Sequence, residues 1–224
     1  MFVKKRKKTA VVIGLGEFGL HLALNLSDMN CDCIVADRNS VRIESIKNYV
    51  MRAVIIDVTQ KESLARIVPS EVDFVVVSLG NVEASVMAVL QLKDLGIKDI
   101  WIKAASEEHE RILRMMGFEN IIFPEKETGK RFATKILSNN LLDFLPLSDD
   151  YSVAELHPLE NMEDKTLKEI DFRKVHNLSV IAIKKKNSGK MIIMPGPDKA
   201  LNPSDTLIVL GKSESIDKYN MKKK

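Results

Sequence analysis

The feature that most constrains this chain is a regular alternation, over residues 9–123, of short apolar segments with longer segments of helical periodicity. The apolar, β-branched segments predict six strands at 9–14, 33–37, 53–57, 72–77, 99–102 and 120–123. The segments between them predict five helices at 18–29, 40–49, 60–67, 82–95 and 106–116. Strands that alternate with helices form βαβ units, and continuously apolar strands are typical of a parallel sheet buried on both faces. We therefore predict an α/β fold with a Rossmann-like, doubly wound parallel sheet.

The sequence pattern changes after Pro124. Residues 127–143 have helical periodicity and predict one further helix that leads away from the sheet. Beyond this helix, turn signals separate short predicted strands at 151–157, 178–185, 190–194 and 206–210. We predict a nucleotide-binding domain over residues 1–140 and a smaller α+β domain over residues 145–224.

The distribution of charge argues against a nucleic-acid-binding protein. Eight of the 34 Lys and Arg residues lie in terminal runs at 4–8 and 222–224, so the rest of the chain has 26 basic and 31 acidic residues. Phosphate backbones need a basic face on the fold itself, and a body of net charge −5 is a poor one. The terminal runs are interpreted as solvated ends, with weak attraction to an anionic membrane face as the alternative.

Several classes of protein are disfavoured by the apolar residues and the cysteines. The longest apolar runs are far shorter than the roughly 20 residues that span a bilayer. The two cysteines, Cys31 and Cys33, are too close in sequence for a disulfide framework and lack the further ligands of a zinc site. We therefore expect a cytoplasmic protein.

A glycine-rich turn, Gly14-Leu15-Gly16-Glu17-Phe18-Gly19, joins the first predicted strand to the first predicted helix. A G-x-G-x-x-G motif alone is weak, but here a strand precedes it, a helix follows it, and Asp37 ends the next strand about 20 residues later. In this context Gly16 lets backbone N–H groups approach a phosphate, and Asp37 accepts hydrogen bonds from ribose hydroxyls. Gly14 makes the turn and Gly19 permits close helix packing. We predict a nucleotide site; the alternative is that the glycines only pack strand against helix.

Ligands of doubly wound sheets bind beyond the carboxyl ends of the strands, where the first and fourth strands diverge. The segments that end strands at this edge are Asp37-Arg38, Asp57-Val58-Thr59 and Ser78-Leu79-Gly80-Asn81. Two interpretations stay open for Arg38, which either stacks on an adenine or is a solvated surface residue. Asp57 either accepts a hydrogen bond from the adenine amino group or caps a helix.

The other half of this crevice offers little for catalysis. A dehydrogenase needs a general acid or base beside the nicotinamide, and Lys103 is the one plausible proton handler at the ends of the fifth and sixth strands. A lone lysine in this position more commonly pairs with a phosphate or a carboxylate. We expect a nucleotide sensor rather than an enzyme. The alternatives are an NAD-dependent oxidoreductase and, disfavoured by the acidic body and the lack of a helix-turn-helix module, a nucleotide-binding transcriptional regulator.

Six segments between residues 9 and 212 carry a family resemblance. They are Val11-Val12-Ile13-Gly14-Leu15-Gly16-x-Phe18-Gly19, Ala36-Asp37, Ile100-Trp101-Ile102-Lys103-Ala104, Pro124-Glu125-Lys126-Glu127-x-Gly129, 147–152 and 195–211. Together they resemble the KTN/RCK-type regulatory subunits of Trk/Ktr potassium uptake systems, in particular the KtrA-like members of the TrkA family. The first motif is shared with many Rossmann proteins, whereas the Trp101 and Pro124 motifs are specific.

The resemblance implies a non-catalytic protein on the cytoplasmic face of the membrane, where it gates a separate, membrane-embedded potassium transporter. It implies a homo-oligomer, with dimers assembled into an octameric ring. Adenine nucleotides, either ATP, ADP and AMP or NAD and NADH, would bind the first domains and change the shape of the ring. Gating then requires that the two ring shapes have different nucleotide affinities, because a ligand that binds both shapes equally does not change the equilibrium between them. The helix at 127–143 would be exchanged between protomers; an ordinary interdomain helix is the alternative.

Glu17 departs from the family pattern, which generally has an arginine that resembles a contact to a terminal phosphate. We hypothesise that Glu17 weakens the recognition of ATP relative to AMP, ADP or NAD, unless a cation or Lys103 compensates. A carboxylate at a helix N-terminus is also favoured by the helix dipole, so Glu17 would stabilise the helix in the absence of ligand.

Two further sites follow from the resemblance alone. Glu125 matches a glutamate that resembles a cation ligand between paired subunits, so the resemblance implies magnesium or calcium there; the alternative is a helix N-terminal acid after Pro124. Related proteins include some that bind cyclic di-AMP in the second domain. Ile170, Arg173 and the Pro195 loop lie in the comparable region.

Overall fold

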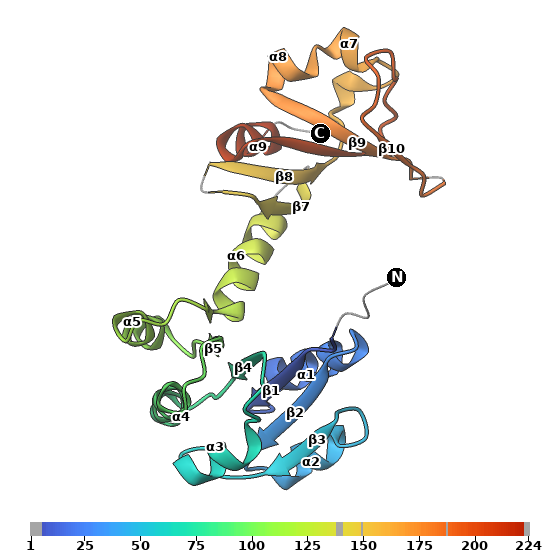
Figure 1. Cartoon of the computed structure of the whole chain (residues 1–224). Coiled ribbons are helices and arrows are strands. Elements are labelled where there is room, and N and C mark those ends of the chain that lie inside the picture. The colour runs from blue at the N-terminus through green and yellow to red at the C-terminus, as the bar shows by residue number, and fades with distance from the viewer. Residues whose placement is uncertain (1–5, 138–140, 149, 187, 222–224) are drawn as a thin grey trace. The chain divides into compact units, whose positions relative to one another are not determined.

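The computed structural model of this chain describes residues 6–137, 141–148, 150–186 and 188–221 (Figure 1). The chain divides into two units, Met1–Pro124 and Glu125–Lys224, and each is described by itself. Within the described ranges, no helix is long and apolar enough to cross a membrane. The domain boundaries at residues 140 and 145 stay a prediction.

The first unit is built on a parallel sheet of six strands. These are β1 (Thr9–Ile13), β2 (Asp32–Asp37), β3 (Arg52–Ile55), β4 (Phe74–Val77), β5 (Ile100–Lys103) and β6 (Ile121–Ile122). Their order is β3-β2-β1-β4-β5-β6, and every neighbouring pair is parallel. This order confirms the predicted α/β fold. The chain reverses direction across the sheet between β1 and β4, and the carboxyl ends of these two strands mark the switch point where ligands of such sheets bind.

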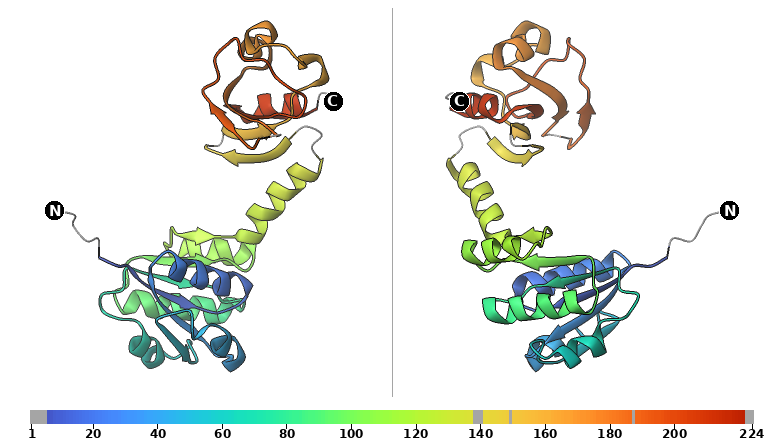
Figure 2. Two further views of the ribbon diagram at one scale, coloured as in Figure 1. Left: turned by 90° about the vertical axis from the view of Figure 1, so that its right-hand side faces the viewer. Right: turned by 60° about the vertical axis from the view of Figure 1, so that its left-hand side comes forward.

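Helices cover both faces of this sheet (Figure 2). They are α1 (Glu17–Asp28), α2 (Ser40–Ile46), α3 (Lys61–Ile67), α4 (Val82–Asp94) and α5 (Glu107–Met115). Successive side chains of a strand point to opposite faces, so Val11 packs in the cluster formed with α3, α4 and α5, while Val12 packs in the cluster formed with α1 and α2. Burial on both faces explains why the strands are almost continuously apolar.

The second unit is built on an antiparallel sheet of five strands. These are β7 (Leu141–Pro146), β8 (Tyr151–Leu156), β9 (Leu178–Lys184), β10 (Met191–Ile193) and β11 (Thr206–Lys212), in the order β10-β9-β11-β8-β7. Its helices are α6 (Pro124–Leu137), the 3-10 helix η1 (Glu160–Met162), α7 (Leu167–Ile170), α8 (Phe172–His176) and α9 (Ser213–Asn220). Phe172 and Tyr219 pack ring against ring in its core, with centroids 5.7 Å apart. This antiparallel arrangement confirms the predicted α+β class of the second domain.

The helix predicted at 127–143 is wrong at its carboxyl end. Helix α6 ends at Leu137, and Leu141–Pro146 form strand β7, which pairs with β8; residues 138–140 of the predicted helix lie outside the described residues. The cause is burial against a distant segment, because Leu141 is 5% exposed and faces Leu156 across the sheet. A short apolar run fits either a helix or a strand, and only its packing partner decides between them.

We predict that Gly19→Ala lowers the free energy of unfolding of the first unit by roughly 1–3 kcal/mol, because overpacking against backbone forces the turn to shift. A Cβ atom added at Gly19 would lie 1.9 Å from the carbonyl oxygen of Gly14. The single tryptophan, Trp101, lies on β5, so its fluorescence during urea denaturation reports this unit. Gly80→Ala is the matched control, because a Cβ there meets nothing within 4 Å. Equal unfolding midpoints for both variants would contradict the prediction.

Candidate nucleotide-binding site

The glycine-rich turn between β1 and α1 is held so tightly that two of its positions exclude any side chain. Gly14 has φ +93°, its N–H donates to the carbonyl oxygen of Ala36 at 2.8 Å, and an added Cβ would lie 2.5 Å from the carbonyl oxygen of Ser78. Gly19 packs against Gly14 in the same way. A Cβ added at Gly16, in contrast, would meet nothing within 4 Å. Gly14 and Gly19 therefore shape the turn, while Gly16 borders open space at the N-terminus of α1.

The N-terminus of α1 combines two opposite electrostatic features. The first N–H groups of a helix have no intrahelical partner and give this end a partial positive charge, which suits a phosphate. Gly16 caps α1 without a side-chain hydrogen bond, and Glu17 is exposed in the first turn, one residue later. The Glu17 carboxylate therefore competes with an incoming anion for the same end of the helix.

The carboxylate of Asp37 ties the loops that follow β1 and β2 together. Asp37 is 6% exposed; its Oδ2 accepts from the backbone N–H of Leu15 at 2.7 Å, and its Oδ1 accepts from the backbone N–H of Asn39 at 2.8 Å. The Arg42 guanidinium lies 3.5 Å from Oδ2. A carboxylate has about four acceptor positions, so two backbone hydrogen bonds leave capacity for ribose hydroxyls.

Asn39 and Arg42 are part of this arrangement and were not predicted from the sequence. The Asn39 side chain caps α2 by accepting from the backbone N–H groups of Val41 and Arg42. An asparagine immediately before a helical pattern is an N-cap signal that would have identified Asn39. No local signal pairs Arg42 with Asp37, because that contact depends on how α2 packs beside β2.

Asp57 and Arg38 lie close together beyond the ends of β3 and β2. The Asp57 Oδ1 accepts from the Thr59 backbone N–H at 3.0 Å and from the Thr59 hydroxyl at 2.7 Å. These two hydrogen bonds, with a smaller contribution from the Arg38 charge, hold the pKa of Asp57 below its ordinary value. The side chains of Asp57 and Arg38 are exposed. Val58, which lies between Asp57 and Thr59 in the sequence, is buried in the core.

The remaining predicted residues have mixed roles at this edge of the sheet. The Ser78 backbone N–H donates to the carbonyl oxygen of Ile13 at 2.7 Å, so the loop after β4 is bonded to the end of β1. Asn81 caps α4 by accepting from the backbone N–H of Ala84 at 2.7 Å, and Gly80 before it is exposed. Lys103 ends β5 and is half-buried.

Three more predicted residues differ in how far they are exposed. Leu15 is buried, Phe18 is half-buried, and Glu125 is exposed in the first turn of α6, in the second unit. Among the described residues, no group of three or more His, Cys, Asp or Glu side chains is arranged to hold a metal ion. The structure thus brings the glycine turn, Asp37 and Ser78 into one bonded cluster, with Arg38 and Asp57 beside each other at the same edge.

We predict that Asp37→Asn lowers the free energy of unfolding by roughly 1.5–3 kcal/mol. The amide keeps one oxygen to accept one of the two backbone hydrogen bonds, and its NH₂ group then faces the other backbone N–H group. Asp57→Asn is the matched control. The exposed Asp57 keeps an acceptor oxygen for Thr59 after this change, so we expect a cost within about 0.5 kcal/mol. Urea denaturation followed by Trp101 fluorescence measures both, and equal costs would contradict the bridging role of Asp37.

Two protein-family descriptions match this chain. The TrkA-N domain family matches residues 10–124, and the TrkA-C domain family matches residues 153–223. The first match covers almost the whole parallel sheet with the glycine turn and Asp37, and the second covers β9, β10, β11 and α9. The two units of the structure therefore carry two different family signatures.

Relatives of known description resemble the chain over almost its full length. Ktr system potassium uptake protein A of Bacillus subtilis (strain 168) is 30% identical over 215 residues, which cover 96% of this chain and 96% of the relative. Ktr system potassium uptake protein C of the same organism is 32% identical over 214 residues, covering 95% of this chain and 96% of the relative.

Solved structures have the same fold. The GsuK RCK domain aligns with a TM-score of 0.65 at 17% identity, over 98% of this chain and 48% of that chain. The GsuK channel bound to NAD aligns with a TM-score of 0.52 at 20% identity, over 96% of this chain and 38% of that chain. The chain therefore belongs to the family of KtrA- and KtrC-like regulatory proteins of Ktr potassium uptake systems, built from a TrkA-N and a TrkA-C domain.

Proposed function

We propose that this regulatory subunit senses an adenine nucleotide at the glycine turn and passes the signal to the membrane transporter of a Ktr system. The observation that carries the proposal is the open space at Gly16, at the N-terminus of a helix and beside a turn that Asp37 holds in place. The family is non-enzymatic, so the nucleotide acts here as a signal and not as a substrate.

Each part of the nucleotide has a place in this proposal. The phosphates lie at Gly16 and the first turn of α1, and the ribose hydroxyls donate to Asp37. The adenine lies beside Arg38 and Asp57, which are both exposed and follow the ends of the neighbouring strands β2 and β3. Thr59, Ser78, Asn81 and Lys103 flank the ligand. The NAD-bound state of the GsuK channel, which shares the fold, supports a nucleotide of this class.

The proposal extends to assembly and location. The subunit acts at the cytoplasmic face of the membrane as a homo-oligomer, with dimers arranged in an octameric ring. A nucleotide then gates the transporter by binding one ring shape more tightly than the other. Glu125 of each subunit contributes to a magnesium or calcium site between subunits.

Cyclic di-AMP is proposed as a second ligand, bound in the region of Ile170, Arg173 and Pro195. The support is that α7 and the segment after Pro195 are joined by two backbone hydrogen bonds. Leu167 N–H donates to the carbonyl oxygen of Lys199 at 3.1 Å, and Lys168 N–H donates to that of Pro197 at 2.9 Å. A ligand that contacts one of these segments therefore acts on both.

We predict that Gly16→Ala weakens nucleotide binding at least tenfold without unfolding the protein. The added Cβ points into the space assigned to phosphate but contacts no protein atom within 4 Å. Calorimetric titration of the full chain with ATP, ADP, AMP and NAD measures the loss, and urea denaturation should show a stability change below about 1 kcal/mol. Wild-type chain that binds none of the four nucleotides, or an alanine variant that binds them all unchanged, would overturn the proposed site.

Glu17→Arg should tighten ATP binding about tenfold relative to AMP, which corresponds to about 1.4 kcal/mol. The reason is that a carboxylate, which repels the terminal phosphates of ATP, is replaced by a guanidinium group, which attracts them. The control is Asp28→Arg, which makes the same charge change at the exposed far end of α1, about 16 Å away along the helix axis. Titrations with ATP and AMP at equal ionic strength give the ratio. An unchanged ratio in Glu17→Arg would show that Glu17 does not set the preference among nucleotides.

A further inference from the structure

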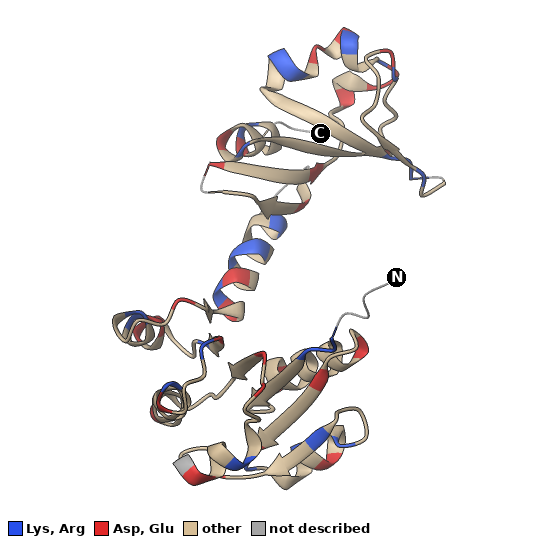
Figure 3. Ribbon diagram, viewed as in Figure 1, with Lys and Arg blue, Asp and Glu red and all other residues tan. Residues whose placement is uncertain are grey.

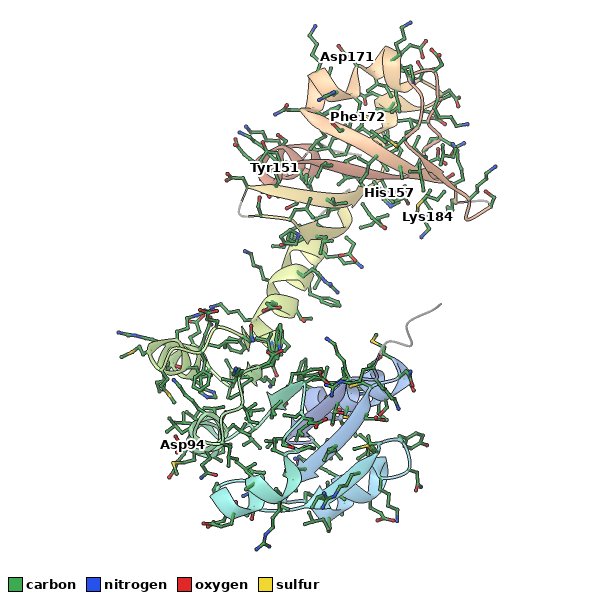
Figure 4. The ribbon with its side chains drawn as sticks, in the orientation of Figure 1. Asp94, Tyr151, His157, Asp171, Phe172 and Lys184 are labelled. Carbon is green, nitrogen blue, oxygen red and sulfur yellow. The ribbon has the colours of Figure 1, made fainter. Side chains whose placement is uncertain are left out.

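A cavity of about 450 Å³ lies in the second unit, at the end of the five-stranded sheet where β9 ends and β11 begins. Its lining includes the side chains of His157, Lys184, Lys185, Lys186, Ser204 and Thr206. Figure 3 shows the basic residues at the base of the β9–β10 hairpin, and Figure 4 shows His157 and Lys184 at this same end of the sheet. The cavity therefore combines several cationic groups with two hydroxyl groups.

Strand register explains why these residues share one face of the sheet. Lys184 and Thr206 are direct partners across the β9–β11 pair, and partners in an antiparallel pair point to the same side. The next pair, Ile183 and Leu207, is buried in the core, so Lys184 and Thr206 point outward. Leu207 also pairs with Leu156 on β8, which brings His157, the following residue, next to Thr206.

An ion pair between half-buried Lys185 and buried Asp205 fixes the hairpin against the segment before β11. The Lys185 ammonium lies 2.5 Å from Asp205 Oδ2, and Asp205 is 2% exposed. Asp205 Oδ2 also accepts from the backbone N–H of Asn202 at 3.0 Å. In the hairpin, Lys185 N–H donates to the carbonyl oxygen of Lys190 and Gly189 N–H donates to that of Lys185, each at 2.9 Å. Both walls of the cavity are thus held in place by contacts within the protein.

The ion pair also decides which charges remain for a ligand. Asp205 is the acidic residue nearest in sequence to the cavity wall, and Lys185 neutralises it. Lys184 and Lys186 are exposed and form no ion pair with any residue that the structure describes. Glu155 is two residues before His157 on the same face of β8 but does not line the cavity. The cavity is therefore net positive.

We propose that this cavity binds a phosphate-bearing anion with at least two negative charges. Lysine ammonium groups bind phosphate as point charges, and hydroxyl groups donate to its remaining oxygens. The phosphate is either that of a free oligophosphate or that of a lipid headgroup. None of Ile170, Arg173 and Pro195, the residues proposed for cyclic di-AMP, lines the cavity, so the proposed anion site differs from that region.

The first test titrates the full chain with inorganic tripolyphosphate by calorimetry at constant ionic strength. Lys184→Gln/Lys186→Gln should weaken binding at least tenfold. The matched control is Lys212→Gln/Lys218→Gln, which removes the same charge from two exposed lysines at the far end of β11 and on α9, outside the cavity. This control should bind within twofold of wild type. If both variants lose tripolyphosphate affinity equally, or if both retain it, the cavity is not the binding site.

The second test measures sedimentation of the same three proteins with phosphatidylcholine vesicles that contain or lack phosphatidylglycerol. If the Lys184→Gln/Lys186→Gln variant alone loses binding to the anionic vesicles, the lipid headgroup is the source of the phosphate. Loss of tripolyphosphate binding alone would identify a free oligophosphate. If wild-type protein binds neither probe, the proposal is wrong. Because all four substituted lysines are exposed, the variants should unfold at the wild-type midpoint.

Discussion

The proposed nucleotide site depends on the two hydrogen bonds that the Asp37 carboxylate accepts from backbone N–H groups. One bond holds the glycine turn after β1, and the other holds the loop after β2, so a single buried side chain sets the distance between two neighbouring loops. The hydrogen bond from Gly14 N–H to Ala36 supports the same junction. Because these bonds are all made within the protein, they define the shape of the turn, and little of a nucleotide's binding free energy would be spent on ordering the site.

Sequence alone predicted the parallel sheet and the glycine turn because both depend on local signals. Apolar strands between periodic helices indicate βαβ units, and Gly14 is required by a positive φ that few other residues adopt. Strand β7 was missed because its conformation is decided by pairing with β8. The contact of Arg42 with Asp37 and the cavity at Lys184 were also missed, because each depends on packing between segments that no sequence pattern links.

Glu17 gives this regulatory subunit a feature that its fold alone would not suggest. Its carboxylate lies in the first turn of α1, where the helix dipole favours a negative charge. A bound phosphate must compete with that carboxylate or recruit a cation. If a nucleotide gates the transporter as proposed, this competition changes the nucleotide concentration at which the switch occurs.

The buried pair of Lys185 and Asp205 has a consequence for how this domain can evolve. Replacing Lys185 alone leaves the Asp205 carboxylate, which is 2% exposed, without its counter-charge, which is destabilising. Exchange of both residues for apolar ones of similar volume is often tolerated, so the two positions are expected to change together among relatives although they lie 20 residues apart. Covariation between them would therefore mark which relatives keep the same hairpin position, even where the exposed lysines around it differ.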